Sequence, residues 1–162
     1  MSFHSQRLLK RTSGFTLIEI LVVISLIAIL AAIVLIAINP ARQFAQGRNA
    51  ERTSNVNAIL NAIGQNIADN KGVWTCGSVY FSSSTTTAAS DVSSSGSNIR
   101  SCLVPTYLPE LPVDPSTGTA WDGTNYDTGY HVATSTAGRF TVCAPNGAET
   151  SIAGSAAICV TR

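Results

Sequence analysis

The side chains in this 162-residue sequence that are suited to chemistry are few and widely spaced. Its two histidines, His4 and His131, have no second ligand at metal spacing, and no Cys-x-x-Cys pair occurs. The sequence also contains no phosphate-binding loop, dinucleotide fingerprint, nucleophile elbow or zincin motif. We therefore predict that the protein is not an enzyme and holds no zinc ion.

Four cysteines remain as candidates for chemistry, and an even number favours disulfides. They are Cys76, Cys102, Cys143 and Cys159. The sequence alone does not choose among their pairings. Cys143 lies in the predicted strand Arg139–Ala144 and Cys159 in the predicted strand Ala156–Thr161, and a connection containing Gly and Asn can bring these strands together as antiparallel neighbours. We therefore favour Cys143 with Cys159, which leaves the first two cysteines for each other.

The apolar segment Phe15–Ile38 indicates on which side of a membrane these cysteines lie. It contains only three polar side chains, Thr16, Glu19 and Ser25. A helix of this length reaches about 36 Å, enough to cross the roughly 30 Å hydrocarbon core of a membrane with some tilt. Basic residues precede it at positions 7, 10 and 11. The positive-inside rule then keeps the N-terminus in the cytoplasm and places the rest outside, where disulfides form.

The carboxylate of Glu19 distinguishes this segment from a plain anchor. An unpaired acidic group in a spanning helix costs on the order of a few kcal/mol. We also do not expect cleavage after the apolar run, as in a secretory signal, because the run is too long and no A-x-A triplet occurs between Phe15 and Ala45. We infer that Glu19 has a partner that compensates its charge.

The residues around this carboxylate resemble the type III signal of type IV prepilins and pseudopilins. They are Gly14, Phe15, Thr16, Leu17, Ile18 and Glu19. The resemblance implies that a prepilin peptidase cuts after Gly14, on the cytoplasmic side, and methylates the new N-terminal Phe15. It implies an assembly role for Glu19, because the new amine can neutralise the carboxylate of a neighbouring subunit in a filament core.

The resemblance and the residue patterns together divide the chain into three parts. Residues 1–14 are a leader, residues 15–38 are the transmembrane and filament-core half of a long helix, and residues 39–162 are an extracellular head. The expected fold class is α+β, with a long N-terminal helix whose second half is amphipathic and packs on a small antiparallel sheet, as in pilins.

The second half of the helix is predicted from an apolar stripe at helical spacing. The stripe consists of Val56, Ile59, Leu60, Ile63 and Ile67. Lys71–Gly72 should end the helix, since glycine adopts the left-handed stop. Asn39–Pro40 either kinks the helix or marks the first turn of a second one.

The sheet is predicted from three short runs that are typical of strands, namely Tyr130–Thr134 and the two runs that carry Cys143 and Cys159. The stretch 82–97 is mostly Ser and Thr, a composition that cannot bury a core, and we predict an exposed loop there. The resemblance adds that pilins carry a variable loop at this position and a disulfide loop near the C-terminus.

A weaker resemblance concerns the Pro-x-Asp-Pro stretch that contains Asp114, with Asp122 and Asp127 following among turn glycines. Some major pseudopilins with such a stretch bind calcium in the loop that follows, and calcium prefers carboxylate oxygens. The EF-hand spacing is absent, and aspartate is also a common turn residue. We therefore favour turn-capping roles for the three carboxylates, keep them as weak calcium candidates, and expect no cofactor.

These observations predict a structural subunit of a type IV pilus, a family that serves adhesion, twitching motility or DNA uptake. The implied partners are other copies of the chain in a helical filament, the prepilin peptidase, the pilus assembly machinery, and the inner membrane before assembly moves the subunit to the cell surface. The formal charge of +1 gives no electrostatic case for nucleic acid outside an uptake role. The alternatives are a pseudopilin of a type II secretion system and a membrane-tethered extracellular binding module.

Overall fold

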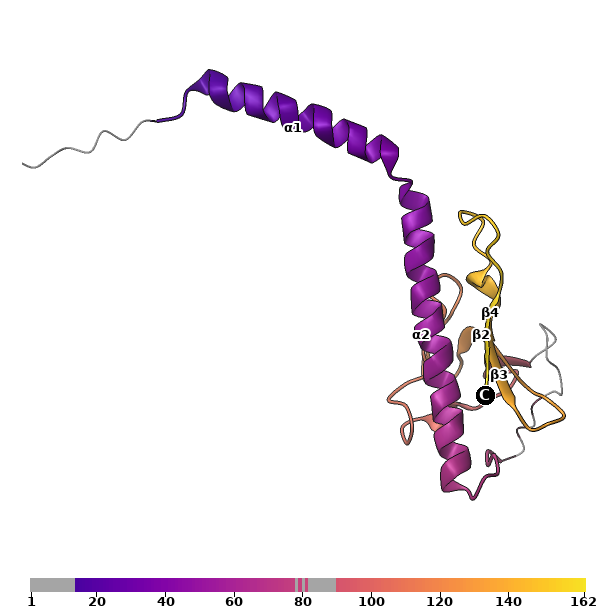
Figure 1. Cartoon of the computed structure of the whole chain (residues 1–162). Coiled ribbons are helices and arrows are strands. Elements are labelled where there is room, and N and C mark those ends of the chain that lie inside the picture. The colour runs from indigo at the N-terminus through magenta and orange to yellow at the C-terminus, as the bar shows by residue number, and fades with distance from the viewer. Residues whose placement is uncertain (1–13, 78, 80, 82–89) are drawn as a thin grey trace, which may run out of the picture. The chain divides into compact units, whose positions relative to one another are not determined.

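The computed structural model describes residues 14–77, 79, 81 and 90–162, and the chain divides into two compact units at Asn39–Pro40 (Figure 1). The first unit contains helix α1 (Leu17–Ala37), and the second, which we call the head unit (Pro40–Arg162), contains all the other elements. The predicted α+β fold class is confirmed, with an apolar N-terminal helix, a second helix and a four-stranded antiparallel sheet.

The ends of α1 are set by Thr16 and Ile38. Thr16 has an extended backbone, and its side chain accepts a hydrogen bond from the backbone N–H of Glu19, which is the usual arrangement of a helix N-cap. Ile38 is also extended, although its N–H still bonds to the carbonyl of Val34 at 3.1 Å. Of the two predictions for this region, the structure shows a break followed by a second helix, which begins at Pro40 because proline needs no N–H partner there.

Helix α2 (Pro40–Asp69) has the predicted apolar stripe. Its buried apolar residues include Val56, Ile59, Leu60 and Ile63. The helix ends at Asp69, and the chain turns through Lys71 and Gly72, which have positive φ angles of 59° and 88°. The N–H of Gly72 donates to the carbonyl of Ile67 at 2.8 Å, which closes the last turn. The predicted stop is therefore confirmed to within a few residues.

The sheet is an antiparallel meander in the order β1-β2-β3-β4. Its strands are β1 (Ser90–Ser93), β2 (Asp127–Thr134), β3 (Phe140–Ala144) and β4 (Ile158–Thr161). Three of them correspond to the predicted strands. The first does not, because it lies inside the Ser- and Thr-rich stretch 82–97, of which residues 82–89 are outside the described residues.

The exposed-loop prediction is wrong for the second half of that stretch. Val92 and Ser93 in β1 are buried, and so is Ser97, which follows the strand. The Thr128 hydroxyl donates to the carbonyl of Val92 at 2.8 Å, and the N–H of Ser97 donates to the carbonyl of Asp91 at 2.7 Å. Pairing with β2 thus gives this polar segment a place in the sheet that its composition does not indicate.

The two faces of the sheet differ in their surroundings. The inner face packs against α2. It contributes buried residues to the core, namely Val92, Tyr130, Val132, Val142 and Ala144. The outer face carries Asp91, His131, Cys143 and Cys159, which are paired in register from β1 to β4. This separation follows from the alternation of side chains along each strand.

The chain between β1 and β2 completes the core. It includes the short helix α3 (Arg100–Leu103), and it buries Ile99, Leu103, Leu111 and Tyr126. A 3₁₀ turn, η1 (Pro145–Gly147), follows β3. The head unit therefore has one hydrophobic core of its own, formed by α2, the sheet and these connections.

Candidate processing and assembly site

The segment that leads into α1 is exposed and lies outside any helix. Gly14, Phe15 and Thr16 precede the first helical residue, and Phe15 is 80% exposed. A Cβ atom added at Gly14 would meet no atom within 4 Å, and its φ is not in the left-handed region. Packing among the described residues therefore does not require glycine at position 14, and the residues on both sides of the peptide bond after it are exposed.

Thr16 and Glu19 form a capping box at the start of α1. The Glu19 N–H donates to Thr16 Oγ1 at 3.3 Å, and the Thr16 N–H donates to Glu19 Oε2 at 3.4 Å. A capping box accepts glutamine as readily as glutamate at this position, so it explains the shape of the side chain and not its charge. Among the described residues, the ion pairs that we find all lie in the head unit, and Glu19 takes part in none of them.

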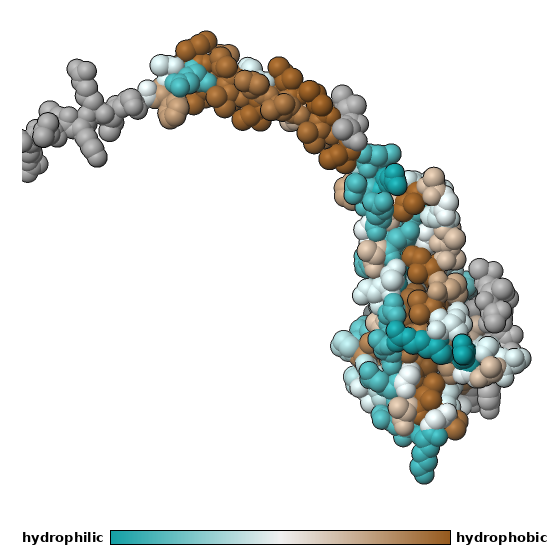
Figure 2. Space-filling model, viewed as in Figure 1, coloured by the Kyte–Doolittle hydropathy of each residue, from teal (hydrophilic) through white to brown (hydrophobic). Residues whose placement is uncertain are grey.

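The rest of α1 carries large apolar side chains that are exposed within the described residues, and Figure 2 shows the face they form on the side in view. Ser25 satisfies its hydroxyl within the helix by donating to the carbonyl of Leu21 at 2.8 Å. Within the described residues, Leu17–Leu35 is the one helical segment long and apolar enough to cross a membrane. An exposed apolar surface of this extent needs a lipid environment or apolar partners.

A buried arginine, Arg52, forms the polar centre of the head unit, and the sequence analysis missed it. Its side chain is 1% exposed, and all five of its N–H donors have acceptors. Two donate to Asp114 at 2.7 and 3.2 Å, and the others reach Asn49, Glu149 and Ser116. The arginine thus joins α2 to two loops that are far away in the sequence.

Glu149 is shared between two arginines of α2. Arg48 donates to it at 2.7 and 2.6 Å, and Arg52 donates at 2.5 Å. The hydrogen bonds from Arg48 and then Arg52 lower the pKa of Glu149 to about 2. Burial opposes ionisation of Asp114, but the hydrogen bonds from Arg52 and Ser116 outweigh it and hold the pKa of Asp114 well below its usual range.

The three aspartates considered for calcium each have a structural role. Asp114 pairs with Arg52 and also accepts hydrogen bonds from the turn that follows it. Asp122 Oδ1 accepts from the N–H groups of residues 124 and 125, and Asp127 Oδ1 accepts from Gly129 N–H. Among the described residues, no group of His, Cys, Asp and Glu side chains is arranged to hold a metal ion. The turn-capping interpretation fits Asp122 and Asp127, whereas Asp114 also belongs to the ion pair.

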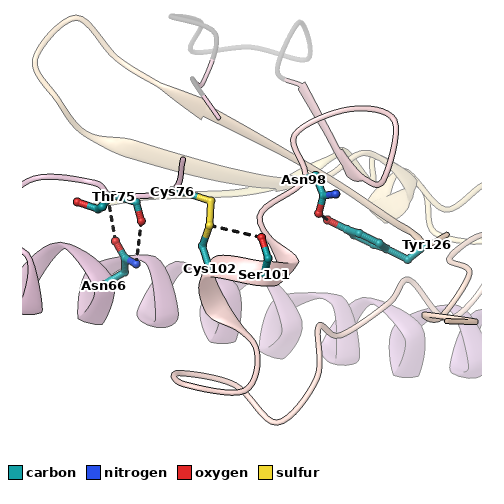
Figure 3. The surroundings of a disulfide bond; sticks show 7 residues. All are labelled: Asn66, Thr75, Cys76, Asn98, Ser101, Cys102 and Tyr126. Carbon is teal, nitrogen blue, oxygen red and sulfur yellow. Dashed lines mark hydrogen bonds between the residues drawn. A yellow bond between two sulfur atoms is a disulfide. The ribbon is translucent and has the colours of Figure 1, made fainter. Parts of the chain in front are cut away.

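In the structure, Cys76 is bonded to Cys102 and Cys143 to Cys159, with Cα–Cα distances of 5.4 and 4.1 Å. Both are the pairs that the sequence favours. Figure 3 shows the first pair beside a second link, in which Asn66 bonds to the N–H and the carbonyl of Thr75, each at 3.2 Å. The chain that leaves α2 is thereby held to the helix.

Most aromatic side chains in the described part of the head unit pack against other side chains. Trp74, Phe81 and Phe140 form a cluster with ring centroids 5.1 to 6.0 Å apart. The guanidinium carbon of Arg100 lies 4.4 Å from the ring centroid of Trp121, a cation–π contact. Both tryptophan rings thus pack against other side chains of the head unit.

Comparison with known proteins bears on the N-terminal segment alone. A family model described as the prokaryotic N-terminal methylation motif matches residues 9–35, which include Gly14, Phe15 and Glu19. No curated protein and no solved structure matches the chain. The resemblance of the segment to a type IV prepilin signal is thereby confirmed, and such a signal implies processing by a prepilin peptidase.

The buried ion pair predicts the effect of removing one charge. The substitution Asp114→Asn leaves the Arg52 guanidinium buried with one carboxylate instead of two, so the free energy of unfolding should fall by about 3 kcal/mol. Asp122→Asn is the matched control, because the same change at an exposed turn should cost less than about 1 kcal/mol. Urea unfolding of the full chain in detergent, followed by tryptophan fluorescence, measures both, since Trp74 and Trp121 lie in the head unit. Equal losses in the two variants would contradict the assigned role of Arg52.

The lowered carboxylate pKa values predict that acid weakens the head unit. The folded-state pKa values of Asp114 and Glu149 lie below those of the unfolded chain, so their stabilisation is present above about pH 5 and is lost as the pH falls toward about 2. The urea midpoint should therefore decrease across this window, and Glu149→Gln should flatten the decrease. A midpoint that stays constant from pH 5 to pH 2 would contradict the coupling.

Proposed function

We propose that the chain is a structural subunit of a type IV pilus, made as a membrane-held precursor and polymerised through α1. The observation that carries the proposal is a prepilin-type signal placed directly before a helix whose apolar side chains are exposed. A head unit with its own core, separated from α1 by the break at Ile38, is suited to stay outside an apolar filament axis.

The proposed processing has Gly14 as the last leader residue and Phe15 as the methylated N-terminus. Two features of the structure support this assignment. The bond between these residues lies in an exposed segment outside α1, and no described atom lies close enough to Gly14 for packing to need glycine there. A requirement for glycine then comes from the protein that cuts the bond.

The proposed assembly role belongs to the charge of Glu19. Inside a membrane, this carboxylate is costly, and the capping box does not need the charge. The amine that cleavage creates at Phe15 of another copy is a cation of the right sign, placed at the same end of the same helix. Pairing the two removes the cost of both charges as the helices come together. The main partner is therefore a second copy of the chain.

The proposed location changes with assembly. The precursor crosses the cytoplasmic membrane through α1, with its basic N-terminal residues inside and its head unit outside. The head unit carries two disulfides, which suit an oxidising compartment. After assembly the subunit lies in a filament at the cell surface, where its role is structural and not catalytic.

The proposed processing predicts the mature N-terminus. Filaments sheared from cells should contain a chain that begins at Phe15 and is heavier by one methyl group at its amine. Intact-mass measurement and fragmentation of the N-terminal peptide give both values. A chain that begins at Met1, or one cut after Ile38, would exclude the pilin proposal. A correctly cut chain that is absent from surface filaments and needed for protein secretion would instead indicate a pseudopilin.

A substitution at Glu19 can separate the role of its charge from its role in the capping box. Glu19→Gln keeps the capping box and removes the charge, so the variant should enter the membrane at least as well as the wild type and yet give few filaments. Glu51→Gln, which removes a carboxylate from an exposed position on α2, is the control and should leave filament yield unchanged. Membrane content and sheared filament yield are measured by immunoblot. Wild-type filament yield from Glu19→Gln would eliminate the charge-pairing step.

A further inference from the structure

Four side chains form one row across the outer face of the sheet. Asp91 on β1 is opposite His131 on β2, His131 is opposite Cys143 on β3, and Cys143 is opposite Cys159 on β4. Side chains that are directly opposite in antiparallel strands lie on the same face, with Cβ atoms about 4.5 to 5.5 Å apart. The row therefore places an imidazole between a carboxylate and a disulfide.

Of the two ring nitrogens of His131, only one has a partner among the described residues. Its Nε2 lies 2.7 Å from Asp91 Oδ1. Its Nδ1 is buried and has no hydrogen-bond partner among the described residues. A buried polar nitrogen without a partner is uncommon and calls for an explanation. A disulfide cannot donate a hydrogen bond to such a nitrogen, whereas the thiol that forms when the disulfide opens can.

The two sulfur atoms of this disulfide differ in access. Cys159 is exposed on the edge strand β4, whereas Cys143 is 1% exposed. A thiolate that approaches from solvent therefore reaches the Sγ atom of Cys159. The sulfur that leaves is then that of Cys143, which is the neighbour of His131.

We propose that the Cys143–Cys159 disulfide is a thiol-exchange site, in which His131 stabilises the sulfur of Cys143 as the leaving group and an external dithiol is the co-reactant. Exchange is faster when the leaving thiolate is stabilised, and a neighbouring imidazolium is a common means of stabilising it. His131 lies opposite Cys143 in the β2–β3 pair, and Asp91 is a positioning residue that orients the imidazole ring through its contact with Nε2.

The exchange proceeds in two balanced steps. In the first, a thiolate of the dithiol bonds to Cys159 Sγ, the Cys143–Cys159 bond breaks, and its electron pair leaves on Cys143 Sγ, which takes the proton of the imidazolium. In the second, the other thiolate of the dithiol attacks the mixed disulfide and releases Cys159 as a thiolate. The protein cystine gains two electrons and the dithiol loses two, becoming a disulfide. Oxidation runs through the same steps in reverse, with the Cys143 proton passing to His131 Nδ1.

The other disulfide serves as a control within the same molecule. Cys76 is buried, and Cys102 is partly buried beside the Ser101 hydroxyl, whose oxygen lies 3.8 Å from the Cys102 sulfur (Figure 3). His131 is the sole histidine among the described residues. Within that part of the chain, the Cys76–Cys102 disulfide therefore has no imidazole of its own. The two disulfides thus share one chain and one solvent, and they differ both in exposure and in the presence of the Asp–His couple, which the variants below separate.

The site is tested by reducing the full chain in detergent with limiting dithiothreitol, trapping free thiols by alkylation, and counting them at each cysteine by mass spectrometry. We expect Cys143–Cys159 to open roughly tenfold faster than Cys76–Cys102. With glutathione as a monothiol probe, the mixed disulfide should form on Cys159. Equal opening rates, or glutathione on Cys143, would overturn the proposal, and these wild-type measurements hold whether or not any variant folds.

Variants then separate the imidazole from simple exposure. His131→Gln should slow the opening of Cys143–Cys159 by roughly tenfold and leave that of Cys76–Cys102 unchanged. Asp91→Asn should slow the same disulfide, and Asp91→Glu, which restores a carboxylate, should recover the rate. Unchanged rates in His131→Gln, or slowing of both disulfides together, would show that the row has no chemical role. None of these measurements requires a filament, so they are independent of the proposed pilus function.

Discussion

The buried guanidinium of Arg52 is the interaction on which the arrangement of the head unit depends. A charge taken out of water is tolerated only when its partners are complete, and here α2 supplies the cation while two distant loops supply Asp114 and Glu149. One turn further along the helix, the Asn55 amide donates to the hydroxyl of Tyr130 at 2.9 Å. The first half of α2 is thus fixed to the head by polar contacts, and its second half is fixed by the apolar core.

Helix α1 obeys the opposite constraint. Among the described residues, no ion pair that we find involves α1, and its large apolar side chains are exposed. Such a surface is suited to hydrocarbon or to apolar partners and not to water. The break at Ile38 separates this helix from α2, which carries its own buried stripe, and the described residues that form the head core all follow Pro40. The chain can therefore combine a segment adapted to hydrocarbon with a head unit whose packing does not depend on that segment.

Local patterns were enough to predict most of this fold. Helices α1 and α2, three of the four strands and the residues of the N-terminal signal follow from periodicity, turn residues and short spacing. What the sequence could not reveal depends on contacts between distant segments. Arg52 and Asp114 are far apart in sequence and carry no local sign of their pairing, so the sequence alone presents Asp114 as a weak calcium candidate and not as the partner of a buried cation. Strand β1 was missed for a similar reason, because only its partner β2 buries Val92.

The capping box at the start of α1 has a consequence for the precursor and the mature form. Both of its residues, Thr16 and Glu19, follow Gly14, so a cut at that glycine leaves the first turn of the helix intact. The cut removes three of the ten basic side chains and none of the nine acidic ones, which changes the side-chain charge from +1 to −2. The two forms would then share the first turn of α1 and separate by isoelectric point, with the shorter chain focusing at the more acidic end of a pH gradient.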